Sequence, residues 1–309
     1  MEVLINRKNN SKFNKRDLIF CILLLLWPTL QFGVFYIGVN FNSFLMTFQK
    51  YDGDVGGMVT SVDYFVDNLK TIGSWFVKDG QINSGFANAL TMSLLCWGTS
   101  LLIGMPLALF FSYYVFKKYK GSSFFRVILY LPSIVSGLIL MVIFKYFVND
   151  VVSGWAKVDP LFFNADYHVR RLLILGFNLW FSFGVSCLMY SNAMSEISPE
   201  ILESAQLDGC KGFNEFWHIC VPMVWPTISV FLVSSLATIF VNQANIYALY
   251  GKDAIPEIQT IGYYMFVTVQ RGQDMYPTMA LLGIMFSLVA IPLTLGVRKL
   301  LEKIGPRTR

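Results

Sequence analysis

Long apolar runs, separated by short polar segments, dominate the pattern of this chain. Each run holds about 20 or more residues, which is the length that a helix needs to cross the hydrocarbon core of a bilayer. We expect six membrane-spanning helices, at about residues 17–40, 86–116, 124–148, 172–195, 219–248 and 277–300. The pattern therefore predicts an all-α polytopic membrane protein, with a cytoplasmic segment at 1–16 and a transmembrane domain over 17–309.

The composition agrees with a membrane environment. Of the 309 residues, 55% are hydrophobic and 14% are charged, whereas a soluble protein carries roughly a quarter charged residues. The first apolar run follows a basic segment, as in a signal peptide, but it continues to about Val39 without a small-residue cleavage site, so we expect an uncleaved span. The five cysteines are scattered without a CxxC pair, and we interpret them as free thiols.

Lysine and arginine set the orientation of the spans. They gather before residue 17, between 117 and 126, and after 297, and such clusters stay on the cytoplasmic side. We therefore expect both termini in the cytoplasm and the segments 49–85, 149–171 and 249–276 outside. This orientation places the polar stretch 196–218, between the fourth and fifth runs, at the cytoplasmic surface.

The polar stretch predicts two short helices joined by a turn. Ser198 and Pro199 suit the start of the first helix. Gly209 suits its end, because a residue without Cβ adopts a positive φ at little cost. A second short helix is expected at about Phe213–Ile219 and leads into the fifth span.

The polar face of this stretch is acidic. It carries one basic residue, Lys211, against the acidic residues Glu196, Glu200, Glu203, Asp208 and Glu215. A helix that lies on lipid usually presents Lys and Arg, and acidic groups are repelled by anionic headgroups. An interfacial helix on lipid is therefore the weaker interpretation, and we expect a protein partner with basic groups.

Five positions of this stretch follow a known spacing. Residues 198–222 read SPEILESAQLDGCKGFNEFWHICVP, in which Glu203, Ala205 and Gly209 are followed by Ile219 and Pro222. The spacing resembles the EAA loop, E-x-A-x-x-x-G followed by I-x-x-P, of the membrane subunits of binding-protein-dependent ABC importers. The first and last spans are similar to the first permease of the pair in carbohydrate importers of the maltose and glycerol-3-phosphate type.

The resemblance implies a type I ABC importer permease fold with a cytoplasmic coupling helix. It implies that Glu203, Ala205, Asp208 and Gly209 couple to the ATPase. It also implies that the chain forms half of the pathway for a sugar or related carbohydrate in the bacterial cytoplasmic membrane. The implied partners are a second homologous permease, two ATPase subunits and an extracytoplasmic solute-binding protein.

ATP hydrolysis is expected in a separate subunit. The chain contains no GxxxxGK[ST] sequence, which an ATP-binding loop of that class needs. We therefore expect no catalytic residues and no cofactor in this chain, with ATP-Mg bound by the partner ATPases. His168 and His218 are far apart in sequence, and we expect no metal site.

Polar residues in the fifth span are candidates for the solute pathway, because sugars need hydrogen-bond partners. Ser235, Thr238, Asn242 and Asn245 recur at three- and four-residue steps and would share one helix face, with Gln243 beside them. The alternative is that these residues hold helices together, as Ser, Thr and Asn often do in membranes.

The fourth span offers a similar set. Asn178, Ser182 and Ser186 form a polar stripe, and Trp180 nearby offers a flat apolar face for a sugar ring. Counted from the EAA glutamate, Ser235 and Asn242 match sugar-contacting positions of the maltose importer's larger permease, and Ser182 falls at a contacting glycine. Thr238 departs from that pattern, so maltose itself is not implied. Oligosaccharides, monosaccharides, acidic sugars and polyol phosphates all remain open.

Two other function classes are weaker. A secondary transporter driven by an ion gradient would need charged side chains deep within the spans, and the sequence has essentially none there. An intramembrane enzyme would need catalytic residues, but no HExxH, GxSxG or paired carboxylates occur in the apolar runs.

Overall fold

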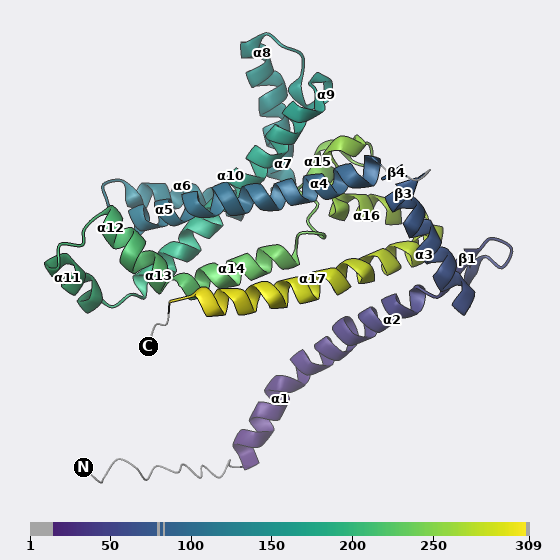
Figure 1. Cartoon of the computed structure of the whole chain (residues 1–309), viewed down its shortest axis with the longest axis horizontal. Helices are drawn as coiled ribbons and strands as arrows, with labels where there is room; N and C mark the ends of the chain where they lie inside the picture. The colour runs from purple at the N-terminus through teal and green to yellow at the C-terminus, as the bar shows by residue number, and fades with distance from the viewer. Residues whose placement is uncertain (1–14, 79–80, 83, 307–309) are drawn as a thin grey trace.

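The computed structural model describes residues 15–78, 81–82 and 84–306. Residues 1–14, which form most of the expected cytoplasmic segment, lie outside the described residues. The rest of the chain is mostly helical, as the all-α prediction requires (Figure 1).

The helices and strands follow one another along the chain. The α-helices are α1 (Lys15–Gln31), α2 (Val39–Met46), α3 (Val62–Phe76), α4 (Ser84–Thr99), α5 (Met105–Phe116), α6 (Ser122–Ile134), α7 (Gly137–Tyr146), α8 (Ser153–Ala156), α9 (Leu161–Asn164), α10 (Tyr167–Ser195), α11 (Pro199–Leu207), α12 (Phe213–Glu215), α13 (Val221–Met223), α14 (Trp225–Ala237), α15 (Ile246–Tyr250), α16 (Ile261–Val269) and α17 (Tyr276–Ile304). The described residues also form four π-helical segments, η1 (Phe32–Gly38), η2 (Ser100–Gly104), η3 (Phe147–Val152) and η4 (Phe216–Cys220), and two 3₁₀ turns, η5 (Pro256–Ile258) and η6 (Gln273–Met275). Two antiparallel pairs join β1 (Gln49–Asp52) to β2 (Gly57–Thr60) and β3 (Val77–Lys78) to β4 (Gln81–Ile82).

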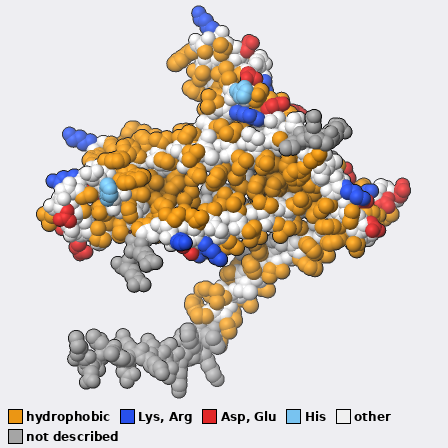
Figure 2. Space-filling view, in the orientation of Figure 1, with side chains coloured by type: hydrophobic (Ala, Val, Ile, Leu, Met, Phe, Trp, Pro, Cys, Tyr) orange, Lys and Arg blue, Asp and Glu red, His pale blue; other side chains and the backbone are white. Residues whose placement is uncertain are grey.

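Five helices of the described chain are long and apolar enough to cross a membrane. They run over Ile19–Met46, Ser84–Phe116, Gly137–Ala156, Tyr167–Ser195 and Gln273–Ile304. The pair Phe213–Met223 and Trp225–Ala237, bent by 66°, gives a sixth span if it is counted as one. Figure 2 shows mostly apolar side chains over the helices, with charged residues gathered toward the ends of the molecule. The chain is therefore a polytopic helical membrane protein.

Two of the expected spans are interrupted. The expected helix 124–148 is divided, because α6 ends at Ile134 and α7 begins at Gly137. Pro132, inside α6, has no N–H for the helical hydrogen bond and weakens the helix at this point.

The expected helix 219–248 is also not continuous. It bends at Val224, between α13 and α14. Pro226 follows and cannot donate a hydrogen bond to the carbonyl group of Pro222. α14 then ends at Ala237, well before the expected end of the span.

The long helix α10 lies at the centre of the packing. It contacts α5 and α6, while α14 lies against α17. One buried cluster joins α7, α10 and α15, and a second joins α5, the end of α10 and the segment 216–228. These two clusters fix the positions of the polar features described below.

Helix α1 stands apart from the bundle. No residue of its most apolar window is buried, and Figure 1 shows α1 leading away from the other helices. Contact with the bundle comes from α2, which lies against α17. In this chain alone, α1 therefore presents apolar side chains on all sides.

Candidate functional site

The polar stretch forms a helical hairpin at one end of the molecule (Figure 1, left). We call residues 196–218 the polar hairpin. Its first helix, α11, begins at Pro199, and Ser198 occupies the N-cap position without a capping hydrogen bond from its side chain. The turn after α11 has Gly209 at a φ of 82°, as expected from the sequence.

Two backbone hydrogen bonds close this turn. The N–H of Gly209 donates to the carbonyl of Gln206 at 3.1 Å, and the N–H of Cys210 donates to the carbonyl of Ala205 at 2.8 Å. The pattern satisfies carbonyl groups at the end of α11 and needs the left-handed conformation that glycine adopts. The turn is therefore set by Gly209.

The acidic residues before the turn face solvent, whereas Ala205 is buried beneath them. The exposed acidic residues are Glu196, Glu200, Glu203 and Asp208. The expectation that Glu215 belongs to the same exposed face is wrong. Its side chain is 2% exposed and forms an ion pair with Lys117. The exposed acidic face is thus confined to the α11 side of the hairpin.

A second polar feature begins where α14 ends. Residues 238–245 are not helical, and Ala244 and Asn245 have φ values of 50° and 55°. We call this segment the α14 break. The expectation that Ser235, Thr238, Asn242 and Asn245 share one face of a continuous helix is therefore wrong.

Asparagine side chains hold the α14 break in place. Oδ1 of Asn242 accepts a hydrogen bond from the N–H of Ala244 at 2.8 Å. Nδ2 of Asn178 donates to the carbonyl of Ala244 at 3.1 Å, and Nδ2 of Asn245 donates to Oδ1 of Asn178 at 3.3 Å. Thr260 Oγ1 donates to the carbonyl of Asn242 at 2.8 Å. Three of these four bonds satisfy backbone groups that the end of the helix leaves unpaired, and the bond between Asn245 and Asn178 joins two side chains.

A small polar cavity of about 60 Å³ lies between α4 and the end of α14. It is lined by Ser93, Cys96, Trp97, Ser100, Ser235, Thr238, Ile239 and Asn242. Nε1 of Trp97 donates to Oγ of Ser235 at 3.2 Å. The structure therefore brings three of the expected pathway residues together with α4 side chains that our sequence reasoning missed. A signal was available, because Ser93, Trp97 and Ser100 recur at helical spacing in the second run.

The other candidate pathway residues do not line this cavity. Gln243 lines an apolar cavity of about 330 Å³ between the α14 break, α16 and α17. The hydroxyl of Ser182 donates back to the carbonyl of Asn178 at 2.9 Å. Trp180 is half exposed and packs against Phe177, with ring centroids 5.9 Å apart.

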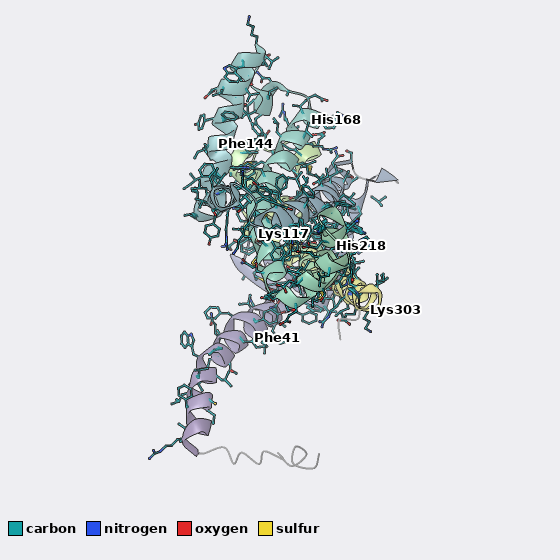
Figure 3. The ribbon with its side chains drawn as sticks, turned by 90° about the vertical axis from the view of Figure 1, so that its left-hand side faces the viewer. Phe41, Lys117, Phe144, His168, His218 and Lys303 are labelled. Carbon is teal, nitrogen blue, oxygen red and sulfur yellow. The ribbon has the colours of Figure 1, made fainter. Side chains whose placement is uncertain are left out.

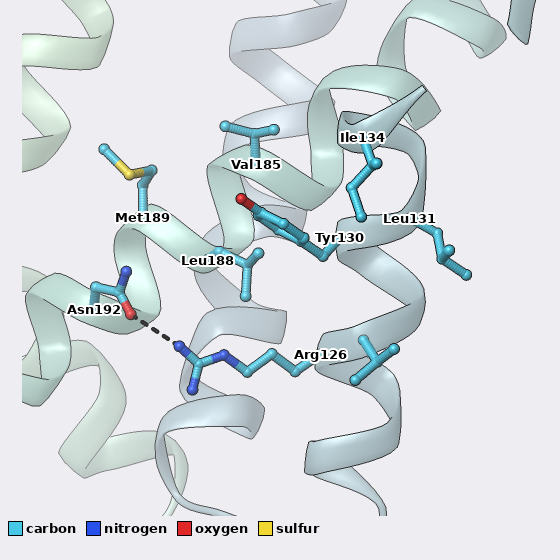
Figure 4. A pocket seen from close by; sticks show the side chains of 9 residues that line it. Arg126, Tyr130, Leu131, Ile134, Val185, Leu188, Met189 and Asn192 are labelled. Carbon is cyan, nitrogen blue, oxygen red and sulfur yellow. Dashed lines mark hydrogen bonds between the residues drawn. The ribbon is translucent and has the colours of Figure 1, made fainter. Parts of the chain in front are cut away.

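A groove runs between α6 and α10. Nine residues from these two helices line the groove, which has a volume of about 740 Å³. Because both of its walls come from neighbouring helices, the groove is open along the remaining side. Figure 4 shows Arg126 reaching across the groove toward Asn192, with Nη2 and Oδ1 3.4 Å apart. Apart from these two residues and Tyr130, the lining is apolar.

No metal centre is found in the part of the chain that the structure describes. It contains no group of three or more His, Cys, Asp or Glu residues that could hold a metal ion. The two histidines lie in different places, at the start of α10 and in η4 (Figure 3).

Residues 100–309 match the family described as "Binding-protein-dependent transport system inner membrane component". The chain is 22% identical over 221 residues to the sn-glycerol-3-phosphate transport system permease protein UgpA of Agrobacterium fabrum, covering 67% of this chain and 74% of that protein. It is also 22% identical over 291 residues to the multiple sugar-binding transport system permease protein MsmF of Streptococcus mutans, covering 91% of each.

Two solved structures share the fold. One is a bacterial ABC transporter involved in the import of the acidic polysaccharide alginate, with a TM-score of 0.75 and 24% identity over 95% of this chain and 98% of that chain. The other is a bacterial alginate ABC transporter in complex with a periplasmic protein bound to alginate pentasaccharide, with a TM-score of 0.70 and 22% identity over 92% and 93% of the two chains.

Proposed function

The chain belongs to the family of binding-protein-dependent transport system inner membrane components, and we propose that it forms half of the pathway of an ATP-driven carbohydrate importer. The observation that carries the proposal is the family match over residues 100–309, which includes the polar hairpin, α10 and the α14 break. Relatives that are sugar and glycerol phosphate permeases support a carbohydrate or a related polar solute.

The polar hairpin is the proposed contact with an ATPase subunit. Its exposed face carries Glu203 and Asp208, and α11 packs through Leu202 against the buried cluster around α5 and the end of α10. An acidic exposed helix suits a cleft with basic groups and not a lipid surface. The ATP would be bound and hydrolysed by that partner, while this chain supplies no catalytic group.

A second permease is the proposed neighbour within the membrane. Helix α1 buries none of its apolar window in this chain, and the groove between α6 and α10 is lined from one side only. A homologous subunit packed against these surfaces would close the groove into a pathway. The side chains around the small cavity, among them Trp97 and Ser235, would offer an aromatic ring and several hydroxyl groups to a sugar that passes beside them, because the cavity itself, at about 60 Å³, is smaller than a sugar ring.

The proposed orientation places the polar hairpin and both termini in the cytoplasm. The C-terminal end of α17 lies beside the start of α14, because Nε1 of Trp225 donates to the carbonyl of Leu301 at 3.2 Å. The hairpin and the end of α17 therefore lie toward the same end of the molecule (Figure 1).

Copurification tests the proposal. The chain, expressed with its neighbouring genes and purified in detergent through an affinity tag, should bring a second permease and an ATPase. Substitution of Glu203 by Lys should remove the ATPase and leave the second permease. A chain that purifies without any ATP-hydrolysing partner under these conditions would contradict the proposal.

A further inference from the structure

The turn of the polar hairpin, which joins α11 to α12, has few contacts that would keep it rigid. Two glycines with positive φ, Gly209 at 82° and Gly212 at 60°, flank Cys210 and Lys211. Apart from Cys210, which is half-buried, these residues are exposed, and a Cβ at either glycine would meet no atom within 4 Å. Because residues 209–212 have so few neighbours, a displacement of α11 would be absorbed by bending of this segment. The displacement reaches the rest of the chain only if the residues after Gly212 are fixed by contacts of their own.

Two contacts hold the chain immediately beyond the second glycine. The hydroxyl of Tyr113 donates to the carbonyl of Gly212 at 3.1 Å. Three residues later, the carboxylate of Glu215 pairs with the ammonium group of Lys117. Tyr113 lies in the last turn of α5, and Lys117 directly follows that helix. Both contacts therefore join α12 to the same end of one helix.

The ion pair is unusual for this chain because it is buried. The side chain of Glu215 is 2% exposed and that of Lys117 is 20% exposed, whereas the two other ion pairs of the described residues are surface pairs. The ammonium group also lies 5.8 Å from the ring centroids of Tyr113 and Phe116. Removing one partner would leave a buried charge unpaired, which is strongly unfavourable.

Aromatic packing makes the same junction stiff. The rings of Tyr113 and Phe216 have centroids 5.3 Å apart, and those of Phe110 and Phe216 are 6.2 Å apart. Phe216 is buried at the end of α12, and Phe110 and Tyr113 belong to α5. In Figure 3, which looks onto the hairpin end of the molecule, Lys117 is labelled near the middle of the view.

Helix α5 continues, through η2, the helix α4 that lines the small polar cavity. Residues Ser84–Phe116 form one helix of 33 residues, which carries Tyr113 near its end and Trp97 at the cavity. A displacement of this helix at its hairpin end would therefore move Trp97 relative to Ser235. The connection from the hairpin to the cavity passes through contacts within this chain.

We propose that Lys117 and Glu215 form a strut that passes movement of the polar hairpin to the helix Ser84–Phe116 and so to the polar cavity. The proposal rests on the proposed function, since it assigns the route by which an ATPase bound at α11 acts on the pathway. Lys117 and Glu215 are positioning residues, because neither touches the solute or ATP.

Charge exchange tests the strut. Lys117→Glu and Glu215→Lys should each reduce the stimulation of ATP hydrolysis by the solute-binding protein at least tenfold, relative to basal hydrolysis, when complexes of equal subunit content are compared. The double variant K117E/E215K should recover at least half of the stimulation. Lys118→Glu is the matched control, because Lys118 is the exposed neighbour of Lys117, and it should behave as wild type.

In the ATPase assay, the strut is overturned by single variants that keep full stimulation, or by a double variant that assembles and recovers less than half of the stimulation. Backbone hydrogen exchange in the full chain gives a readout that needs no ATPase. Lys117→Met should accelerate exchange at residues 212–216 at least tenfold, and unchanged exchange would overturn the strut. A wild-type complex that hydrolyses no ATP would count against the proposed function, while the exchange measurement would still decide on the strut.

Discussion

Nδ2 of Asn178 lies 3.1 Å from the carbonyl oxygen of Ala244 and donates a hydrogen bond to it. Ala244 has a φ of 50°, a conformation that residues with a Cβ seldom adopt. The side chain of α10 thus holds a strained segment of the α14 break. This contact makes Asn178 a structural residue. Asn242, in contrast, lines the small cavity.

Replacing Asn178 with alanine should destabilise the protein. The change leaves the carbonyl of Ala244 and the amide of Asn245 without their partner, at a cost of about 1–3 kcal/mol. Thermal unfolding in detergent measures this cost, with the exposed Asn214→Ala as control. An unchanged unfolding temperature together with weaker solute transport would assign Asn178 to the solute and not to the fold.

Gly262 should not tolerate a side chain. A Cβ at this position would collide with the backbone of Val241 and Asn242 in the α14 break, which cannot move aside as a flexible side chain does. Gly262→Ala should therefore lower the unfolding temperature by several degrees. Gly176→Ala is the control, because a Cβ there meets no atom within 4 Å and alanine favours the helix α10. Equal effects of the two substitutions would contradict the close approach.

Trp97 should contribute to solute affinity if the solute passes beside the small cavity. Trp97→Ala removes an aromatic contact worth up to about 1.5 kcal/mol, so the solute concentration for half-maximal uptake should rise by up to about tenfold. Trp97→Phe keeps a ring and loses only the hydrogen bond to Ser235, so its effect should be smaller. Uptake with unchanged half-saturation in Trp97→Ala would exclude this cavity as a solute site.

Gly209 should be sensitive to the shape of its replacement. Its φ of 82° strains a β-branched residue by about 1–2 kcal/mol or more, whereas asparagine adopts this conformation more readily. Gly209→Val should therefore abolish ATP-driven uptake, and Gly209→Asn should retain a substantial part of it. Uptake assays in whole cells, with membrane content checked by immunoblotting, distinguish the two. Equal loss in both variants would mean that the left-handed turn is not what matters.

The sequence pattern predicts the helical membrane fold and the polar hairpin, because apolar runs and the glycine turn are local signals. It misses the contact between Trp97 and Ser235 because these residues are 138 positions apart. It also treats Glu215 as exposed, since the partner Lys117 belongs to another helix. Helical spacing places Asn242 and Asn245 on a continuous helix. In the structure the helix ends before them, because the carbonyl groups of residues 242 and 244 accept hydrogen bonds from the side chains of Thr260 and Asn178.

The source of energy is the central claim. The direct measurement is solute uptake into vesicles that contain the complete complex with its solute-binding protein, with ATP on the hairpin side. Uptake should require hydrolysable ATP, persist when ionophores remove all ion gradients, and disappear in Glu203→Lys although the solute-binding protein still binds its solute. Uptake that continues without ATP and stops with the ionophores would contradict the account.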